Sequence, residues 1–147
     1  MIRLVILGEA ASKANSRQIV TLGGKPSSIK SAKARGYERD ALRQIPPAAR
    51  QRLEGPVKVT MTIYYASEMP DLDESIVLDV LQDRYVKAKK DADGNVVRPR
   101  ELVQSGVYRN DRQVRWKDIR HAIDRKNPRA EILIEPMEPQ QQDLVVI

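Results

Sequence analysis

Apolar and polar residues alternate most regularly over residues 57–65, a pattern typical of a β-strand with one buried face. Shorter β-prone runs at 2–7 and 128–136 predict a first and a last strand, the latter bounded by prolines. The segment 114–124 is β-prone with polar interruptions, which is typical of an edge strand. The pattern therefore predicts a sheet of about four strands.

Two segments show helical spacing instead of alternation. Apolar residues recur every three or four positions within 31–52 until Pro46 and Pro47 interrupt the pattern, and again within 73–85, where Asp73 is well placed as the N-cap. The segment 9–33 is polar and rich in small residues, which predicts a loop with a weak strand at 18–22.

The segment 84–105 departs from both patterns. Basic and β-prone residues flank the turn-forming residues 91–95, which predicts a protruding basic hairpin inserted into a domain that spans 1–136. Residues 137–147 are expected to form a flexible tail. The chain is therefore expected to fold as a single α+β domain with a small mixed sheet of about four strands and two or three helices.

Composition narrows the function classes. The 147 residues carry a formal charge of +6, with a pI near 9.7, which favours an anionic partner such as nucleic acid. The absence of cysteine excludes disulfides, thiolate zinc sites and thiol nucleophiles, and the single histidine, His121, is expected at the surface. No run is apolar and long enough to span a membrane or to act as a signal peptide, so a cytoplasmic location without membrane contact is expected.

Three aspartates carry the candidate chemistry. Asp71 and Asp73 follow the predicted strand at 57–65, and residues two apart in an extended chain project from the same face. Asp111 lies in a second polar segment. Carboxylates crowded together are stable beside a cation, and the cation expected here is Mg²⁺ holding a phosphate. The alternative is structural, with Asp73 capping a helix and the other two in turns.

These segments resemble a known family. Pro-Asp-Leu-Asp at 70–73 before an apolar helix, Gly-Val-Tyr-Arg-Asn-Asp-Arg-Gln-Val at 106–114 and the last strand are together similar to the RusA-type Holliday junction resolvases, metal-dependent endonucleases that include prophage members. The segment 31–39 is similar to the first helix of the family. The resemblance covers most of the chain outside 84–105 and the tail.

The resemblance implies an Mg²⁺-dependent endodeoxyribonuclease acting on four-way DNA junctions in recombination and repair, and its prophage members make a phage origin one of the expectations. It implies a homodimer, with Mn²⁺ able to replace Mg²⁺. Asp71, Asp73 and Asp111 match the catalytic and metal-binding aspartates of the family. This chain has Glu74, a further candidate ligand, where the family usually has Asn, and a family lysine falls at Val77 in an ungapped match. Lys117, Arg112 or a lysine of 84–105 could supply the missing cation.

The DNA-binding surface is expected to consist mainly of basic residues, and the low aromatic content favours contacts to the DNA backbone over base stacking. The candidates are Lys13, Asn15, Arg17, Lys25, Lys30, Lys33, Lys87, Lys89, Lys90, Arg98, Arg100 and Arg112. Two alternatives remain open: a non-catalytic basic DNA-binding or architectural protein, and a nuclease that acts on other branched DNA or on RNA.

Overall fold

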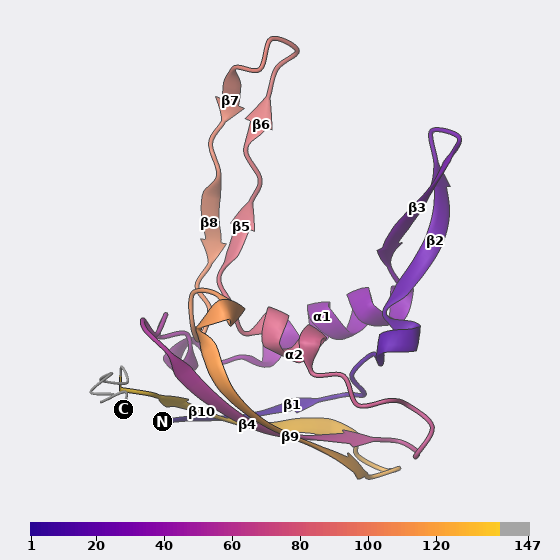
Figure 1. The fold of residues 1–147 in the computed structure, drawn as a ribbon, viewed down its shortest axis with the longest axis vertical. Helices are drawn as coiled ribbons and strands as arrows, with labels where there is room; N and C mark the ends of the chain where they lie inside the picture. Colours follow the sequence, from indigo (N-terminus) through magenta and orange to yellow (C-terminus); the bar gives the residue numbers. More distant parts are fainter. Residues whose placement is uncertain (139–147) are drawn as a thin grey trace, which may run out of the picture.

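The computed structural model describes residues 1–138 and contains one mixed sheet with helices on one face (Figure 1). The strand order is β1 (Ile2–Leu7), β10 (Arg129–Pro136), β4 (Val57–Tyr65) and β9 (Val114–Ile123). β9 pairs parallel with β4, while the other neighbours are antiparallel. The expected α+β class, mixed sheet and edge position of β9 are confirmed.

The core lies between this sheet and two helices, α1 (Ala32–Gln44) and α2 (Ser75–Val80). β4 alternates as predicted, so that all five of its odd-numbered residues are buried. α1 buries Ala34, Tyr37 and Ala41 in the same core. Ser31 caps α1 by accepting a hydrogen bond from the N–H of Ala34, and the helix ends before Pro46 and Pro47, which cannot continue it.

The second helix is shorter than predicted. α2 covers six residues of the expected 73–85, and its N-cap is Glu74, one residue after the predicted Asp73. The Glu74 side chain makes no capping bond, whereas the Asp73 carboxylate accepts a hydrogen bond from the N–H of Ser75, the first residue of the helix. The chain leaves the helix because the backbone after Val80 bonds to another segment: the N–H of Val107 donates to the carbonyl of Leu81. These tertiary bonds replace the next helical turn.

Two hairpins project from the side of the sheet that the helices cover (Figure 1). The first is formed by β2 (Arg17–Leu22) and β3 (Lys25–Lys30), joined at Gly23 and Gly24, both of which have positive φ. Most of this segment was predicted as a loop, and only its weak strand at 18–22 was expected. We call this hairpin the short arm.

The second hairpin, here called the long arm, is formed by 84–104. It consists of β5 (Arg84–Val86) paired with β8 (Glu101–Gln104), and β6 (Lys89–Lys90) paired with β7 (Val96–Arg98). Short 3₁₀ turns complete the fold at η1 (Lys13–Asn15), η2 (Pro47–Ala49) and η3 (Asp111–Gln113). The predicted tail, apart from Met137 and Glu138, lies outside the described residues.

The helices found within 1–138 include none that is both long and apolar enough to cross a membrane.

Candidate active site

The loop from β4 to α2 carries Asp71 and Asp73. The backbone N–H of Asp73 donates to the hydroxyl of the buried Tyr65 at 3.1 Å, and one Asp73 carboxylate oxygen accepts from the N–H and the hydroxyl of Ser75 at 3.0 and 2.6 Å. Asp71 is exposed. The loop is therefore fixed at Asp73, while the Asp71 side chain extends into solvent.

His121 supports the same loop from β9. Its ring stacks on Tyr65 with centroids 4.8 Å apart, and its Nε2 lies 3.1 Å from the carbonyl oxygen of Pro70. Although His121 is exposed, as expected, it also holds the backbone next to Asp71. Burial and the neighbouring acidic residues, including Asp73, raise the pKa of Tyr65, so its hydroxyl stays protonated at neutral pH.

Asp111 is held by a capping box in the segment that follows the long arm. The Asn110 side chain accepts from the N–H of Arg112, while the Gln113 side chain accepts from the N–H of Asn110. The N–H of Asp111 donates to Oε1 of Gln82 at 3.0 Å, and Nε2 of Gln82 donates to Asp79 at 2.8 Å. Gln82 therefore links Asp111 to the end of α2.

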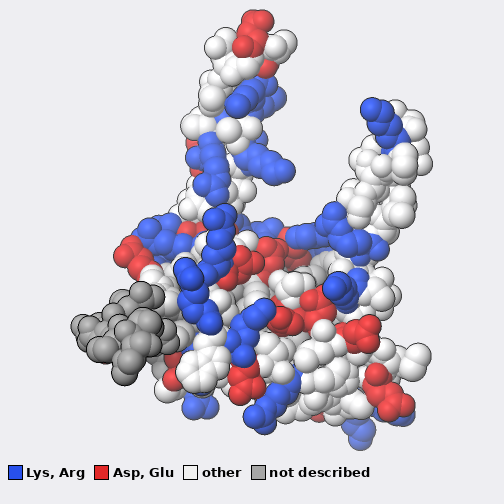
Figure 2. All heavy atoms as spheres, viewed as in Figure 1, with Lys and Arg blue, Asp and Glu red and all other residues white. Residues whose placement is uncertain are grey.

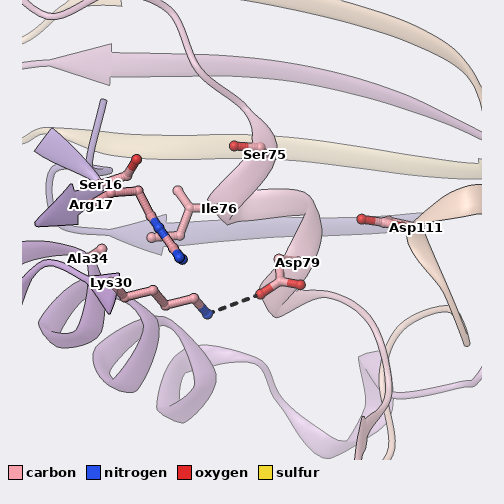
Figure 3. A pocket seen from close by; sticks show the side chains of 8 residues that line it. All are labelled: Ser16, Arg17, Lys30, Ala34, Ser75, Ile76, Asp79 and Asp111. Carbon is pink, nitrogen blue, oxygen red and sulfur yellow. Dashed lines mark ion pairs between the residues drawn. The ribbon is translucent and has the colours of Figure 1, made fainter. Parts of the chain in front are cut away.

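Two adjoining clefts meet at Ser75 and Asp111. The larger, of about 350 Å³, lies between α2, the base of the short arm and the start of α1 (Figure 3). The smaller, of about 210 Å³, extends toward β9. The larger cleft is lined by Ser16, Arg17, Lys30, Ala34, Ser75, Ile76, Asp79 and Asp111, and the smaller by Glu74, Ser75, Leu78, Asp111, Val114 and Lys117.

The acidic side chains around the clefts have basic partners. Lys30 lies 3.6 Å from Asp79 and 2.5 Å from Glu38, which also binds Arg84 at 2.6 Å. Burial opposes ionisation of Glu38, but the hydrogen bonds from Lys30 and Arg84 prevail and hold its pKa below the usual value. The clefts therefore combine negative charge with cations that could contact a phosphate.

The structure groups the predicted site residues only in part. Asp111 and Glu74 border the smaller cleft, and Asp73 accepts a hydrogen bond from the hydroxyl of Ser75, which lines the same cleft. Within residues 1–138, however, no three Asp, Glu or His side chains are positioned to hold one ion together. Carboxylate oxygens are the ligands that Mg²⁺ prefers. The candidate residues therefore fit this ion in their chemistry and in lying near one another.

Lys117 and Glu74, predicted as catalytic cation and metal ligand, contact each other at 3.0 Å. In this arrangement each neutralises the other. Val77 is fully buried in the core, so a cation for the cleft has to come from another position.

The predicted DNA-binding residues lie on both arms and between them. In Figure 2, Lys and Arg side chains follow the long arm, lie at the tip and base of the short arm, and edge a surface between the arms that is partly acidic. Some of these residues are already bound: Lys33 pairs with Glu9 at 2.7 Å, Arg17 bonds to Ser28, and the amide of Asn15 bonds to Ser12. The residues that are exposed are Lys13, Asn15, Arg17, Lys25, Lys33, Lys87, Lys89, Lys90, Arg98, Arg100 and Arg112.

Sequence reasoning missed Asp79 and Gln82. Asp79 is the one polar residue in the apolar run 76–81, a signal that could have singled it out. Gln82 gave no such signal, because its role depends on the position of Asp111 in space.

Comparison with known proteins adds independent evidence. A search of curated proteins finds no match to this chain. A family model described as "Endodeoxyribonuclease RusA" matches residues 9–135, which include both arms, both clefts and all three candidate aspartates. The chain therefore belongs to the RusA endodeoxyribonuclease family.

Proposed function

We propose that this protein is an Mg²⁺-dependent endonuclease that hydrolyses phosphodiester bonds in branched DNA, with the four-way junction as its principal substrate. One observation carries the proposal: Glu74 and Asp111, which are far apart in sequence, border one cleft at the base of the two arms, and Asp73 is hydrogen-bonded to Ser75 of the same cleft. We call the surface formed by the two clefts and the carboxylates of Asp73, Glu74, Asp79 and Asp111 the acidic floor, and the family membership makes it the candidate catalytic centre.

Asp71, Asp73 and Asp111 are the residues proposed to hold the metal, with Glu74 as a further candidate. Bound Mg²⁺, or Mn²⁺ in its place, supplies a Lewis acid and lowers the pKa of an attacking water. The chain itself fixes Asp73 through Ser75 and Asp111 through Gln82. Arg17 and Lys30 line the larger cleft, where they can attract and orient a phosphate.

Lys117 is the leading candidate for the cation that stabilises the transition state. It borders the same cleft as Asp111, whereas Val77 is buried. Because Lys117 is bound to Glu74, its use in catalysis requires this ion pair to open when the metal or the phosphate arrives. Arg112, exposed beside Asp111, is the second candidate.

A four-way junction requires two opposed nicks, and each chain offers one acidic floor. We therefore propose that the active form is a homodimer, which places two sites in a symmetric arrangement. The proposed role in DNA recombination and repair, in a bacterial or phage-infected cell, corresponds to a cytoplasmic location. Light scattering coupled to size exclusion tests the dimer, and a monomer bound to an intact junction would contradict it.

The decisive experiment uses a labelled mobile four-way junction, with and without Mg²⁺. We expect paired nicks in the presence of the ion only. Asp73→Asn and Asp111→Asn should each lower the rate by about 100-fold or more, since even groups that only support metal ligands contribute about 10- to 100-fold. Junction binding in EDTA should persist, because each change removes a negative charge beside the phosphate.

Asp118→Asn provides a matched control. Asp118 pairs in register with Thr60, a neighbour of the buried Val59, so it lies on the face of the sheet opposite the core. This variant should cut at the wild-type rate. Nicking that needs no divalent ion, or that survives in Asp111→Asn, would refute the proposal.

A specific observation favours the non-catalytic alternative: within the described part of the chain no three carboxylates form a ready ion site. An architectural DNA-binding protein would bind the junction without ever nicking it, and Asp111→Asn would then leave its behaviour unchanged. Replication forks, flaps, linear duplex and RNA in the same assay distinguish the junction from other substrates.

A further inference from the structure

The long arm is one continuous ribbon with an interruption. Tyr85 pairs with Leu102 and Val86 with Glu101, and continuing this register along both strands predicts the observed pair of Lys89 with Arg98. The same register places Ala88 opposite Pro99, which has no N–H to donate to a ladder. The gap between the two strand pairs therefore lies where a proline prevents pairing. The strands keep the same residue register on both sides of the gap.

This register places four cations on one face. Side chains alternate along a strand, so Tyr85, Lys87 and Lys89 share one face of the arm. Arg98, which pairs with Lys89, and Arg100, two residues further, lie on the same face of the opposite strand. The guanidinium of Arg100 lies 3.7 Å from the centroid of the Tyr85 ring, as this assignment requires. We call Lys87, Lys89, Arg98 and Arg100 the cationic face.

The acidic residues of the arm lie elsewhere. Asp91 and Asp93 are in the turn at the tip, where an Asp91 carboxylate oxygen accepts from the N–H groups of Asp93 and Asn95. Glu101 and Lys90 alternate to the opposite face. Figure 2 shows this separation, with acidic side chains at the tip and basic ones between the tip and the floor. A phosphate backbone would repel the tip and attract the middle of the arm.

The cationic face is available for binding. None of its four members forms an ion pair within residues 1–138, and all four are exposed. By contrast, Lys30, Lys33 and Lys117 near the floor are paired with carboxylates. Cations two apart on a strand are separated by about 6.6 Å, close to the separation of successive phosphates along a strand of nucleic acid.

The face begins at a set distance above the floor. Arg84 is bound to Glu38 beside the larger cleft, and Lys87 and Lys89 follow it by three and five residues. At about 3.3 Å per residue this places them roughly 10 to 17 Å along the arm. A DNA duplex that rests on the floor is thick enough for the backbone on its far side to lie level with Lys87 and Lys89. A single strand on the floor is too thin to reach them.

We propose that the cationic face of the long arm binds backbone phosphates on the flank of a double helix seated on the acidic floor, so that the arm selects double-stranded over single-stranded substrate. The contact is made by the side of the arm and not by its tip. This inference rests on the proposed function, since it takes the floor to be the place where DNA binds.

The test is the salt dependence of binding, measured by fluorescence anisotropy in EDTA for a four-way junction and for a single strand. Each phosphate contact adds about 0.9 to the slope of log K against log salt on a duplex. Replacing the four residues of the cationic face by Gln should therefore reduce the junction slope by up to about 3.6. The single-strand slope should stay at its wild-type value.

Neighbouring lysines give a matched pair. Lys89→Gln should lower the junction slope by about 0.9. Composition alone also made Lys90 a DNA-binding candidate, but the register places it on the opposite face and so excludes it from this contact. Lys90→Gln, with the same charge change, should therefore leave the slope unchanged. Asp93→Asn should change affinity less than two-fold. Equal effects of Lys89→Gln and Lys90→Gln, an equal loss on single strands, or a large gain from Asp93→Asn would overturn the proposal.

The outcome is separable from that of the nuclease assay. If the wild type does not nick the junction but the Gln variants lower the salt slope as described, the arm still binds duplex DNA and only the catalytic proposal is wrong. If metal-dependent nicking is observed while the slope is unchanged, the catalytic proposal stands and this inference is wrong. Circular dichroism melts of each variant should match the wild type, because the arm lies outside the core.

Discussion

Among the glycines of this protein, Gly106 has the least room for an added side chain. A Cβ added there would lie 2.3 Å from the carbonyl carbon of Gln82, 2.5 Å from the nitrogen of Asp83 and 2.5 Å from the carbonyl oxygen of Tyr108. All three atoms belong to the backbone, so no side chain can rotate away to make room. Gly106→Ala must therefore move the backbone segments at 82–83 and 106–108, which enter and leave the long arm.

The expected cost follows from the surroundings. The N–H of Gly106 donates to the buried Asp83 carboxylate at 2.7 Å, and Arg52 binds the same carboxylate at 2.8 Å. Overpacking in a dense region typically costs about 1 to 3 kcal/mol. Because the clash also disturbs this buried hydrogen bond, we expect about 3 kcal/mol, which corresponds to a fall of about 10 °C in Tm for a chain of this length.

Gly36→Ala is the matched control. Gly36 lies inside α1, and the nearest atom to an added Cβ is the flexible end of Arg39 at 4.0 Å. The same chemical change should stabilise the protein there by up to about 1 kcal/mol, because alanine favours the helix over glycine. Urea denaturation of both variants measures the two free energies of unfolding. The packing argument is refuted if Gly106→Ala is as stable as the wild type.

Two further predictions concern polar contacts. Gln82→Leu removes both the acceptor for the N–H of Asp111 and the donor to Asp79. Single-turnover junction cleavage should therefore slow about 10-fold, while junction affinity stays within about two-fold of the wild type. An unchanged cleavage rate would show that the link through Gln82 is not needed. Because the pKa of Glu38 is lowered in the folded state, its ionised form stabilises the protein above the unfolded pKa near 4.3, and this contribution is lost as pH falls through the lower folded pKa. Urea denaturation should thus show Glu38→Gln less stable than the wild type at pH 7 and the difference shrinking below about pH 4, and a difference independent of pH would contradict the assignment.

The sequence alone determined the elements whose pattern is local. Alternation predicted β4, and a run of β-prone residues predicted β10, because a strand with a buried core face needs apolar residues at set positions. Helical spacing ended by two prolines predicted α1, whose Ser31 cap is also local. The order of the acidic motifs carried the resemblance to the family that the family model then confirmed.

Tertiary structure decided what depends on partners distant in sequence. The strand β3 contains Pro26 and two serines, so it pairs because β2 lies beside it and not because of its own propensity. α2 ends at Val80 because the backbone of the segment after the long arm bonds to Leu81. The parallel pairing of β9 with β4 likewise has no local signature.

The candidate site divides in the same way. The sequence predicted Asp73 and Asp111 as candidate site residues from their types and motifs. The hydrogen bond between Asp111 and Gln82 and the pairing of Glu74 with Lys117 join residues that are 29 and 43 positions apart. Composition revealed that the long arm is basic, whereas its strand register revealed that the cations share one face. Residue type and local spacing can be read from the sequence alone. Distances between side chains that are remote in sequence are fixed only when the backbone has folded.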